Sequence, residues 1–345
     1  MKFGASPQRT PSAPSAVGVT MWRAGLWLLV SLWVGAALSA SGMQRCGDDV
    51  DGHGPAVPCA CGDVLVSSRT LGSEDPVTTT VCTGSGLLVA APGAVTLALG
   101  GQTITGSGQG IGVLVLRGTL TLEGGGQIEG FETGVMARGA HALSSVMNVR
   151  LSANRLDGLF VEGDGYSIQG SAAEGNGRDG FALGGSTYAL DGNRATANGR
   201  YGFSLWGMGA HAGGGLGNEA DGNGMTGFLL RGMWHQVLDV NAAANHGDGF
   251  FGTGMHLLLS GIHTDRNLRS GLRAMGMAIA IGDSTASGNR GFGVWVMGPD
   301  VDDRGGNRGT DNAGVEGFAT TPSVMMGEMM PALVQCRIGM MTPCK

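Results

Sequence analysis

The feature that most constrains this fold is a repeat that runs from Asn154 to Gly298. Each repeat reads Asn, three residues, Gly, an apolar residue, any residue, a second usually apolar residue, any residue and Gly. The recurring asparagines are Asn154, Asn176, Asn198, Asn223, Asn245, Asn267 and Asn289. They follow one another at spacings of 22, 22, 25, 22, 22 and 22 residues. A fixed period of this length is typical of a solenoid, in which each repeat is one coil that packs on its neighbours.

The residues inside the repeat indicate strands. The segment after the first Gly has two inward positions around an outward one, which is the period of a β-strand. Gly- and Asn-bearing turns separate these segments, and Gly tolerates the positive φ that tight turns need. We therefore predict an all-β chain that forms a parallel β-helix of roughly ten coils, right-handed because parallel crossovers almost always are. The asparagines are expected to point inward and to stack their side-chain amides from coil to coil.

Composition excludes two other classes of protein. Gly accounts for 67 of the 345 residues but shows no G-X-Y period, which excludes collagen. Only 14% of the residues are charged and the net charge is −6. The chain therefore lacks the basic footprint of a nucleic-acid-binding protein, and we expect no nucleic-acid partner.

Residues 1–42 have the layout of a secretory signal. Arg23 precedes an apolar run from Leu26 to Leu38, and small residues follow at 39–42. This run is short for a membrane span, so we predict a signal peptide that is cleaved near 39–42. A signal that begins at Met21 would have ordinary proportions, and an uncleaved anchor is the alternative. The mature chain is then expected to have no transmembrane segment and to be secreted, periplasmic or held at the cell surface.

All six cysteines lie outside the repeats, at Cys46, Cys59, Cys61, Cys82, Cys336 and Cys344. An even number behind a signal peptide predicts disulfides formed in an oxidising compartment. The last two cysteines are a natural pair, and the other four then pair with one another at the N-terminal end. A zinc site is the competing hypothesis, but Cys59-x-Cys61 has no second ligand pair at the spacing of a zinc finger.

Residues 86–106 read GLLVAAPGAVTLALGGQTITG. This segment resembles the opening coils of secreted bacterial proteins of the parallel β-helix repeat family, within the pectate-lyase-like superfamily, whose pattern is close to GLxVxAxGVTLDLxGHTITG. Here Ala98 replaces the family's Asp and Gln102 its His. The resemblance covers about residues 60–320 and implies the fold. It leaves activity open, because the family includes lyases, hydrolases, epimerases and many proteins without known chemistry.

The repeat and its flanks divide the chain into four parts. They are a signal region over 1–42, a Cys-containing segment or cap over 43–86, a β-helix over 87–318 and a Met- and Cys-bearing tail over 319–345. The ends are expected to cover the terminal coils, because a bare strand edge would aggregate.

The outward positions of the repeated strand supply the ligand-binding candidates Trp206, Arg231, Trp295, Phe251 and Arg273. Aromatic rings and guanidinium groups on an outer sheet face are suited to stacking on sugars and binding their hydroxyl or acidic groups. A covering tail is the alternative explanation. The three extra residues of the longer repeat fall within 208–217 and are expected to bulge beside the strand that carries Trp206.

Acidic residues recur at fixed offsets in the turns, and the candidates are Asp157, Asp179, Glu174 and Asp221. Carboxylates on adjacent coils could act as an acid–base pair or bind calcium, although solvated turn acids are the simpler interpretation. Pieces such as Gly47-Asp48-Asp49, Gly52-His53-Gly54 and Arg337-Ile338 resemble motifs of polygalacturonases, but they are not spaced along successive coils. We attribute these matches to chance.

Met208, Met233, Met255 and Met277 recur once per coil, with His211, His235 and His256 nearby. We expect these methionines to fill the core, because Met at a fixed inward offset usually does. Copper is the alternative, since it takes thioether and imidazole ligands.

The sequence contains no nucleophile elbow, HExxH motif or phosphate loop. We therefore predict an exported, non-catalytic protein that needs no cofactor and binds an extracellular polysaccharide or a cell-surface partner. A carbohydrate-active enzyme, either a polysaccharide lyase, hydrolase or epimerase, is the second hypothesis. A periplasmic copper-handling protein is the third.

Overall fold

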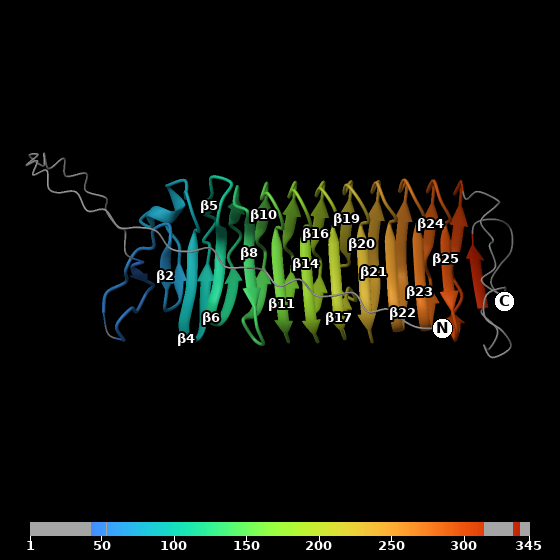
Figure 1. Cartoon of the computed structure of the whole chain (residues 1–345), viewed down its shortest axis with the longest axis horizontal. Helices are drawn as coiled ribbons and strands as arrows, with labels where there is room; N and C mark the ends of the chain where they lie inside the picture. Colours follow the sequence, from blue (N-terminus) through green and yellow to red (C-terminus); the bar gives the residue numbers. More distant parts are fainter. Residues whose placement is uncertain (1–42, 53, 314–333, 339–345) are drawn as a thin grey trace, which may run out of the picture. The chain divides into compact units, whose positions relative to one another are not determined.

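The computed structural model describes residues 43–52 and 54–313, and the backbone of 334–338. The predicted signal peptide, Cys344 and most of the tail lie outside these residues. Within the described part, nearly all regular structure is β-strand, and the strands stack side by side along one axis (Figure 1). The prediction of an all-β parallel solenoid is confirmed.

Each coil contributes strands to parallel ladders that run along the solenoid. The first ladder contains β1 (Arg45–Cys46), β2 (Asp63–Leu65), β4 (Leu87–Ala98), β6 (Ile111–Glu123), β8 (Thr133–Arg138), β11 (Leu159–Asp164), β14 (Phe181–Ser186), β17 (Phe203–Met208), β20 (Phe228–Met233), β22 (Phe250–Asp265), β23 (Leu272–Gly282) and β25 (Val294–Gly298). β28 (Val334–Ile338) then pairs with β25 in the antiparallel direction. It therefore covers the backbone edge that β25 would otherwise leave open.

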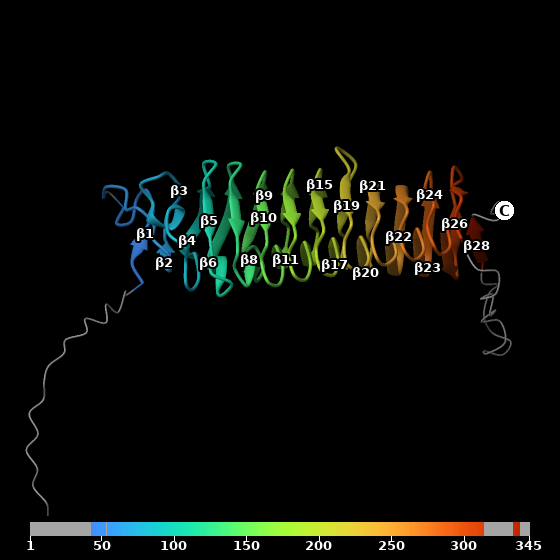
Figure 2. The ribbon, with the colours of Figure 1, turned by 90° about the horizontal axis from the view of Figure 1, so that it is seen from above.

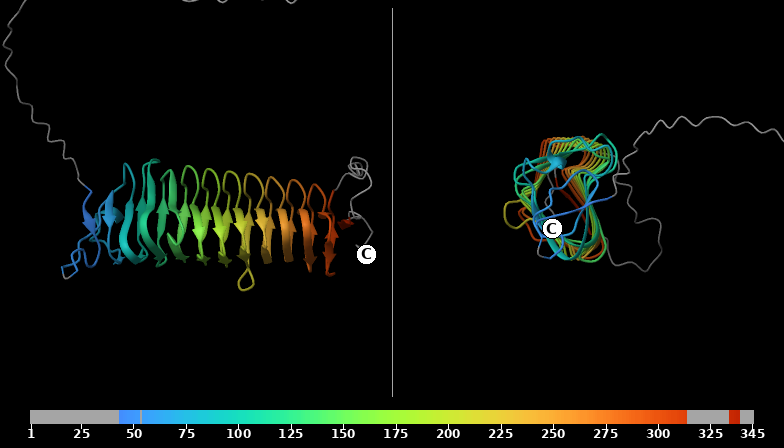
Figure 3. Two further views of the ribbon diagram at one scale, coloured as in Figure 1. Left: turned by 60° about the horizontal axis from the view of Figure 1, so that its bottom comes forward. Right: turned by 90° about the vertical axis from the view of Figure 1, so that its left-hand side faces the viewer.

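Two further ladders complete the coil. The second contains β3 (Arg69–Thr70), β9 (Leu143–Met147), β12 (Ser167–Gln169), β15 (Ala189–Asp191), β18 (His211–Ala212), β21 (Gln236–Ala243), β26 (Val301–Asp303) and parts of the long strands. The third contains β5 (Thr103–Thr105), β7 (Gln127–Glu129), β10 (Arg150–Ser152), β13 (Ala172–Glu174), β16 (Arg194–Thr196), β19 (Asn218–Asp221), β24 (Thr285–Ser287), β27 (Arg308–Thr310) and the ends of β21 and β22. Viewed along the axis, successive coils nearly superpose (Figure 3).

The solenoid has about 12 turns, where the sequence predicted roughly ten. The difference arises because residues 43–86 form coils of their own. β1 and β2 extend the first ladder, and a short 3-10 helix, η1 (Pro76–Thr78), lies in the same segment. Nothing in residues 43–86 repeats the Asn–Gly pattern, so the period could not reveal these coils.

The interior is filled by the inward residues of the first ladder. Leu159, Phe181, Phe203, Phe228 and Phe250 are fully buried at one position of five successive coils. The rings of Phe181 and Phe203 stack at 4.9 Å, and those of Phe203 and Phe228 at 4.5 Å. The closing Gly of each strand lets adjacent coils approach, because a Cβ on Gly207 would lie 2.0 Å from the carbonyl oxygen of Gly185.

The seven asparagines of the repeat are buried and form a continuous hydrogen-bonded ladder. The Oδ1 of Asn223 accepts the backbone N–H and the side-chain amide of Asn198, and its own amide donates to Asn245 Oδ1 and to the carbonyl of Ala195. The ladder continues to Asn312, which accepts from Asn289. A shorter second ladder joins Asn193 to Asn218. The sequence analysis missed this one because Val240 takes the same place in the next coil.

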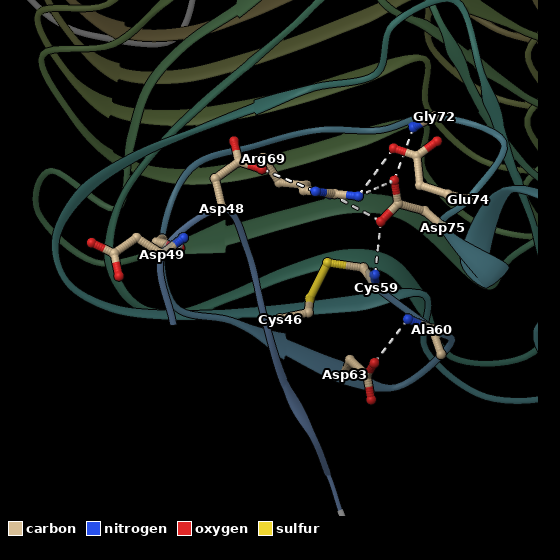
Figure 4. Close-up of a disulfide and its surroundings, with 11 residues drawn as sticks. Cys46, Asp48, Asp49, Cys59, Ala60, Asp63, Arg69, Gly72, Glu74 and Asp75 are labelled. Carbon is tan, nitrogen blue, oxygen red and sulfur yellow. Dashed lines mark hydrogen bonds and ion pairs between the residues drawn. A yellow bond between two sulfur atoms is a disulfide. The ribbon is translucent and has the colours of Figure 1, made fainter. Parts of the chain in front are cut away.

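Two disulfides lie in the N-terminal segment, Cys46–Cys59 and Cys61–Cys82. The four N-terminal cysteines therefore pair with one another, and the zinc hypothesis is wrong for Cys59 and Cys61. Arg69 lies beside the first disulfide, buried, and bonds to Asp48, Glu74 and Asp75 (Figure 4). Asp48, part of a chance motif match, thus has a structural role.

Candidate functional site

The ligand-binding candidates lie on the outer side of the first ladder, here called the outer face. Its first row, in register, is Phe160, Ala182, Ser204, Leu229, Phe251, Arg273 and Trp295. Its second row is Glu162, Gly184, Trp206, Arg231, Thr253, Met275 and Met297. Trp206 and Arg231 are therefore neighbours on adjacent strands, as are Arg273 and Trp295.

The indole of Trp206 reaches over Gly184 of the preceding coil. A Cβ on Gly184 would fall 2.0 Å from the indole, so only Gly at that position leaves room for the ring. The centroid of Trp206 is 6.0 Å from that of Phe160, and the guanidinium carbon of Arg138 lies 4.8 Å from the Phe160 centroid. Phe160 and Trp206, with Arg138 before them and Arg231 after them, form what we call the aromatic platform.

The candidates towards the C-terminal end form a second group with stronger internal contacts. The Arg273 guanidinium lies 4.1 Å from the Phe251 centroid, and its Nη2 is 2.9 Å from Oδ2 of the buried Asp248. Burial raises the pKa of Asp248, and the positive charge of Arg273 opposes that rise. Arg273 is thus already engaged by Phe251 and Asp248. The aromatic platform is the more available surface.

The acidic turn candidates do not form a free carboxylate pair. Asp157 and Asp179 are buried, so the interpretation of solvated acids is wrong for both. Arg178 bonds Asp157 through two nitrogens, and Arg200 bonds Asp179 in the same way at 2.7 and 2.6 Å. These hydrogen bonds raise the pKa of each arginine. Because each carboxylate is neutralised by an arginine from the next coil, the pairs stabilise the turns.

The other two acidic candidates lie on the third ladder, away from the outer face. Glu174 pairs with Arg150, and Asp221 is in register with Thr196 one coil earlier. Among residues 43–52 and 54–313, no three His, Cys, Asp or Glu side chains converge to hold a metal ion.

Two carboxylates beside the platform were not singled out as an acidic pair. Glu162 and Asp164 lie on β11, two residues apart on the same side of the strand as Phe160. Glu162 is exposed, whereas Asp164 accepts hydrogen bonds from the hydroxyl and backbone N–H of Ser186. The hydroxyl bond is the main reason that the pKa of Asp164 is lowered. The sequence could have revealed this pair, because Glu162 and Asp164 follow Phe160 at every second position of one predicted strand.

The insertion of the longer repeat lies within the predicted range 208–217, but not beside the strand that carries Trp206. The extra residues lie in the loop 213–217 between β18 and β19, so β18 separates them from the end of β17. Figure 2 shows this loop projecting on the edge of the solenoid away from β17. There Leu216 donates its N–H to Asp191. The loop therefore does not flank Trp206 or Arg231.

The methionine row is exposed, so the prediction that it fills the core is wrong. Met208, Met233 and Met277 are 46%, 37% and 41% exposed, and Met255 is half-buried. Successive side chains of a strand point alternately into the solenoid and out of it. Counting from Phe203, which points inward, therefore places Met208 on the outside. The nearby histidines differ: His235 is buried, whereas His211 and His256 are exposed.

His235 is held in the interior by the backbone. Its Nδ1 accepts the N–H of Ala210 at 3.0 Å, and its Nε2 lies 3.3 Å from the carbonyl oxygen of Arg231. Burial lowers the pKa of His235, so the ring is neutral at pH 7. Because both ring nitrogens are already engaged by the backbone, His235 is not available as a metal ligand.

The class of the protein follows from its own strand pairing, which is that of a parallel β-helix of about 12 turns. No protein-family model matches the sequence, and the comparison with curated proteins found no match. The chain is similar to the crystal structure of pectate lyase Pel9A, at 14% identity and a TM-score of 0.34 over 78% of this chain and 74% of that one. It is also similar to PfbA, a surface adhesin of Streptococcus pneumoniae, at 9% identity and a TM-score of 0.23 over 73% of this chain and 82% of that one.

The disulfides indicate an oxidising environment, as outside the cell. In the part of the chain that the structure describes, no helix is both long and apolar enough to cross a bilayer.

Proposed function

We propose that this protein is an exported glycan-binding protein whose ligand stacks on the aromatic platform. The observation that carries the proposal is the position of Trp206, whose ring covers Gly184 and lies beside Phe160. An indole supported by backbone on one side presents its other side to a ligand at little cost in side-chain entropy. Sugar rings have apolar faces that pack on such a surface.

The charges around the platform indicate the kind of glycan. Arg138 contacts Phe160 on one side, and Arg231 is the in-register neighbour of Trp206 on the other. Both arginines are exposed, and a guanidinium binds carboxylates and sulfates with paired hydrogen bonds. We therefore expect acidic polysaccharides to bind more tightly than neutral ones.

The test compares wild type with the double variant Trp206→Ala, Arg231→Ala on a glycan array. We expect binding to weaken about tenfold or more, since loss of one stacking contact and one charged hydrogen bond removes at least about 1.4 kcal/mol. Trp234→Ala is the matched control, because Trp234 is also exposed but lies past the end of β20, outside both rows of the outer face. Unchanged binding in a folded double variant, or equal loss in the control, would rule out the platform.

A second candidate function is glycan cleavage, and Glu162 with Asp164 is the observation that favours it. Residues two apart on one strand lie about 6.6–6.8 Å apart, within the range of carboxyl separations in inverting glycosidases. The lowered pKa of Asp164 keeps it ionised, as a general base requires.

Turnover separates the two functions. Glu162→Gln and Asp164→Asn should abolish the release of reducing ends if the pair is catalytic, while leaving Trp206-dependent binding intact. If the wild-type protein binds a polysaccharide but releases no reducing or unsaturated ends, the non-catalytic function stands.

A further inference from the structure

A row of methionines borders the outer face and has no packing role in the core. Met208, Met233, Met255 and Met277 are in register on successive strands of the first ladder, at the ends of β17 and β20 and within the longer β22 and β23. Adjacent strands are about 4.8 Å apart, so their thioethers lie side by side on the surface. Large exposed side chains gathered in this way usually mark a contact with another species.

Two rings stand next to this row at the following corner. Trp234 follows Met233, and His256 follows Met255 on the next coil. The indole and imidazole stack with centroids 3.7 Å apart and an interplanar angle of 4°. Neither ring nitrogen of His256 has a hydrogen-bond partner among the residues that the structure describes. We call Met233, Trp234, Met255 and His256 the Met–His corner.

The donor atoms of the Met–His corner suit a soft monovalent metal ion. Thioether sulfur selects Cu(I), and imidazole is also a good copper ligand. With metal–sulfur bonds of about 2.3 Å, as in zinc thiolates, an ion midway between two sulfurs needs them about 4.6 Å apart. Met233 and Met255 are directly paired on adjacent strands, so their flexible side chains can bring the two sulfurs to this separation. Within residues 43–52 and 54–313 all four cysteines form disulfides, so thioethers are the soft sulfur ligands left in this part of the chain.

We propose that Met233, Met255 and His256 bind a cuprous ion. The face of Trp234 adds cation–π attraction for the bound charge. Met208 and Met277, one strand spacing to either side, supply further thioethers to which the ion can pass along the row. None of these donor residues belongs to the aromatic platform, and Cu(I) binding is measured without a glycan.

The test is an anaerobic titration of the full chain with Cu(I) against a chromogenic Cu(I) chelator. Wild type should withdraw the ion from the chelator, and the double variant Met233→Leu, Met255→Leu should bind it about a hundredfold more weakly. Leu keeps nearly the same apolar volume, so the strands should fold as before. Met225→Leu is the matched control, since Met225 is 45% exposed but lies in a turn outside the row.

His256→Gln gives a second measurement that leaves the strands unaltered. We expect about tenfold weaker Cu(I) binding, and Ag(I), a redox-inert analogue, should show the same order of affinities. Zn(II) should bind at least a hundredfold more weakly than Cu(I), because thioethers are poor zinc ligands. The proposal is overturned if the double variant and His256→Gln bind Cu(I) like wild type, or if Met225→Leu weakens binding equally.

Discussion

The central coils, residues 154–298, and the N-terminal segment, residues 43–86, are stabilised by different interactions. In the central coils each asparagine bonds the same residue one coil away, and stacked Phe rings fill the interior. In the N-terminal segment no residue type recurs from coil to coil. There two disulfides and the buried ion pairs of Arg69 hold β1, β2 and the loops around them.

This difference follows from the number of neighbours. A central coil has an equivalent coil on each side, so a side chain that bonds its own copy is satisfied in both directions. Among the described residues, the first coil has an equivalent coil on one side only, so a ladder of this kind would be satisfied there in one direction. Covalent links and ion pairs stabilise a coil without help from an identical one.

The largest expected effect is the loss of Arg69. Arg69→Met leaves the fully buried Asp75 carboxylate without its partner, which should lower the free energy of unfolding by about 3–5 kcal/mol. The control is Arg45→Met, because Arg45 and Asp51 form an exposed pair worth less than about 1 kcal/mol. Denaturant unfolding measures both, and equal effects would contradict the role assigned to Arg69.

Removing the disulfide that joins Cys46 to Cys59 should have the next largest effect. The two residues are 13 apart, and Cys46→Ser, Cys59→Ser should lower stability by about 2–4 kcal/mol. Because solenoid coils contact only their neighbours, hydrogen exchange should accelerate in 43–86 and stay unchanged in 154–298. Faster exchange throughout would show that the two regions unfold as one unit.

Breaking the asparagine ladder tests the central coils. Asn223→Leu leaves groups of Asn198, Asn245 and Ala195 without partners and should cost about 2–3 kcal/mol. Asn241→Leu is the matched control, because Asn241 is exposed and should change stability by less than about 0.5 kcal/mol. If Asn223→Leu melts like the control, the ladder does not stabilise the fold.

The smallest effect concerns pH. Burial lowers the pKa of His235 in the folded protein, so only the unfolded chain takes up its proton as pH falls below about 6.5. The free energy of unfolding should therefore fall on acidification below that pH, and this residue contributes no change above it. His235→Leu, which copies Leu257 of the next coil, should remove this part of the pH dependence. If His235→Leu keeps the pH dependence of wild type, a group other than His235 causes it.

The sequence by itself determined the solenoid, its coil register and most of its interior. A period of 22 residues fixes which side chains meet on adjacent strands, because parallel pairing repeats the same geometry at each coil. The row that joins Trp206 to Arg231 follows directly from that register. Where the period was absent, in residues 43–86, the sequence predicted the pairing partners only as a group of four cysteines.

Only the tertiary structure decided which contacts the side chains of the solenoid make. It paired Asp157 with Arg178, laid Trp206 across Gly184 and brought Trp234 onto His256. It also placed the insertion beyond β18 and the methionine row outside. The physical reason is that a repeat period fixes backbone register, whereas side-chain direction at corners and contacts between different residue types depend on the local packing of each coil.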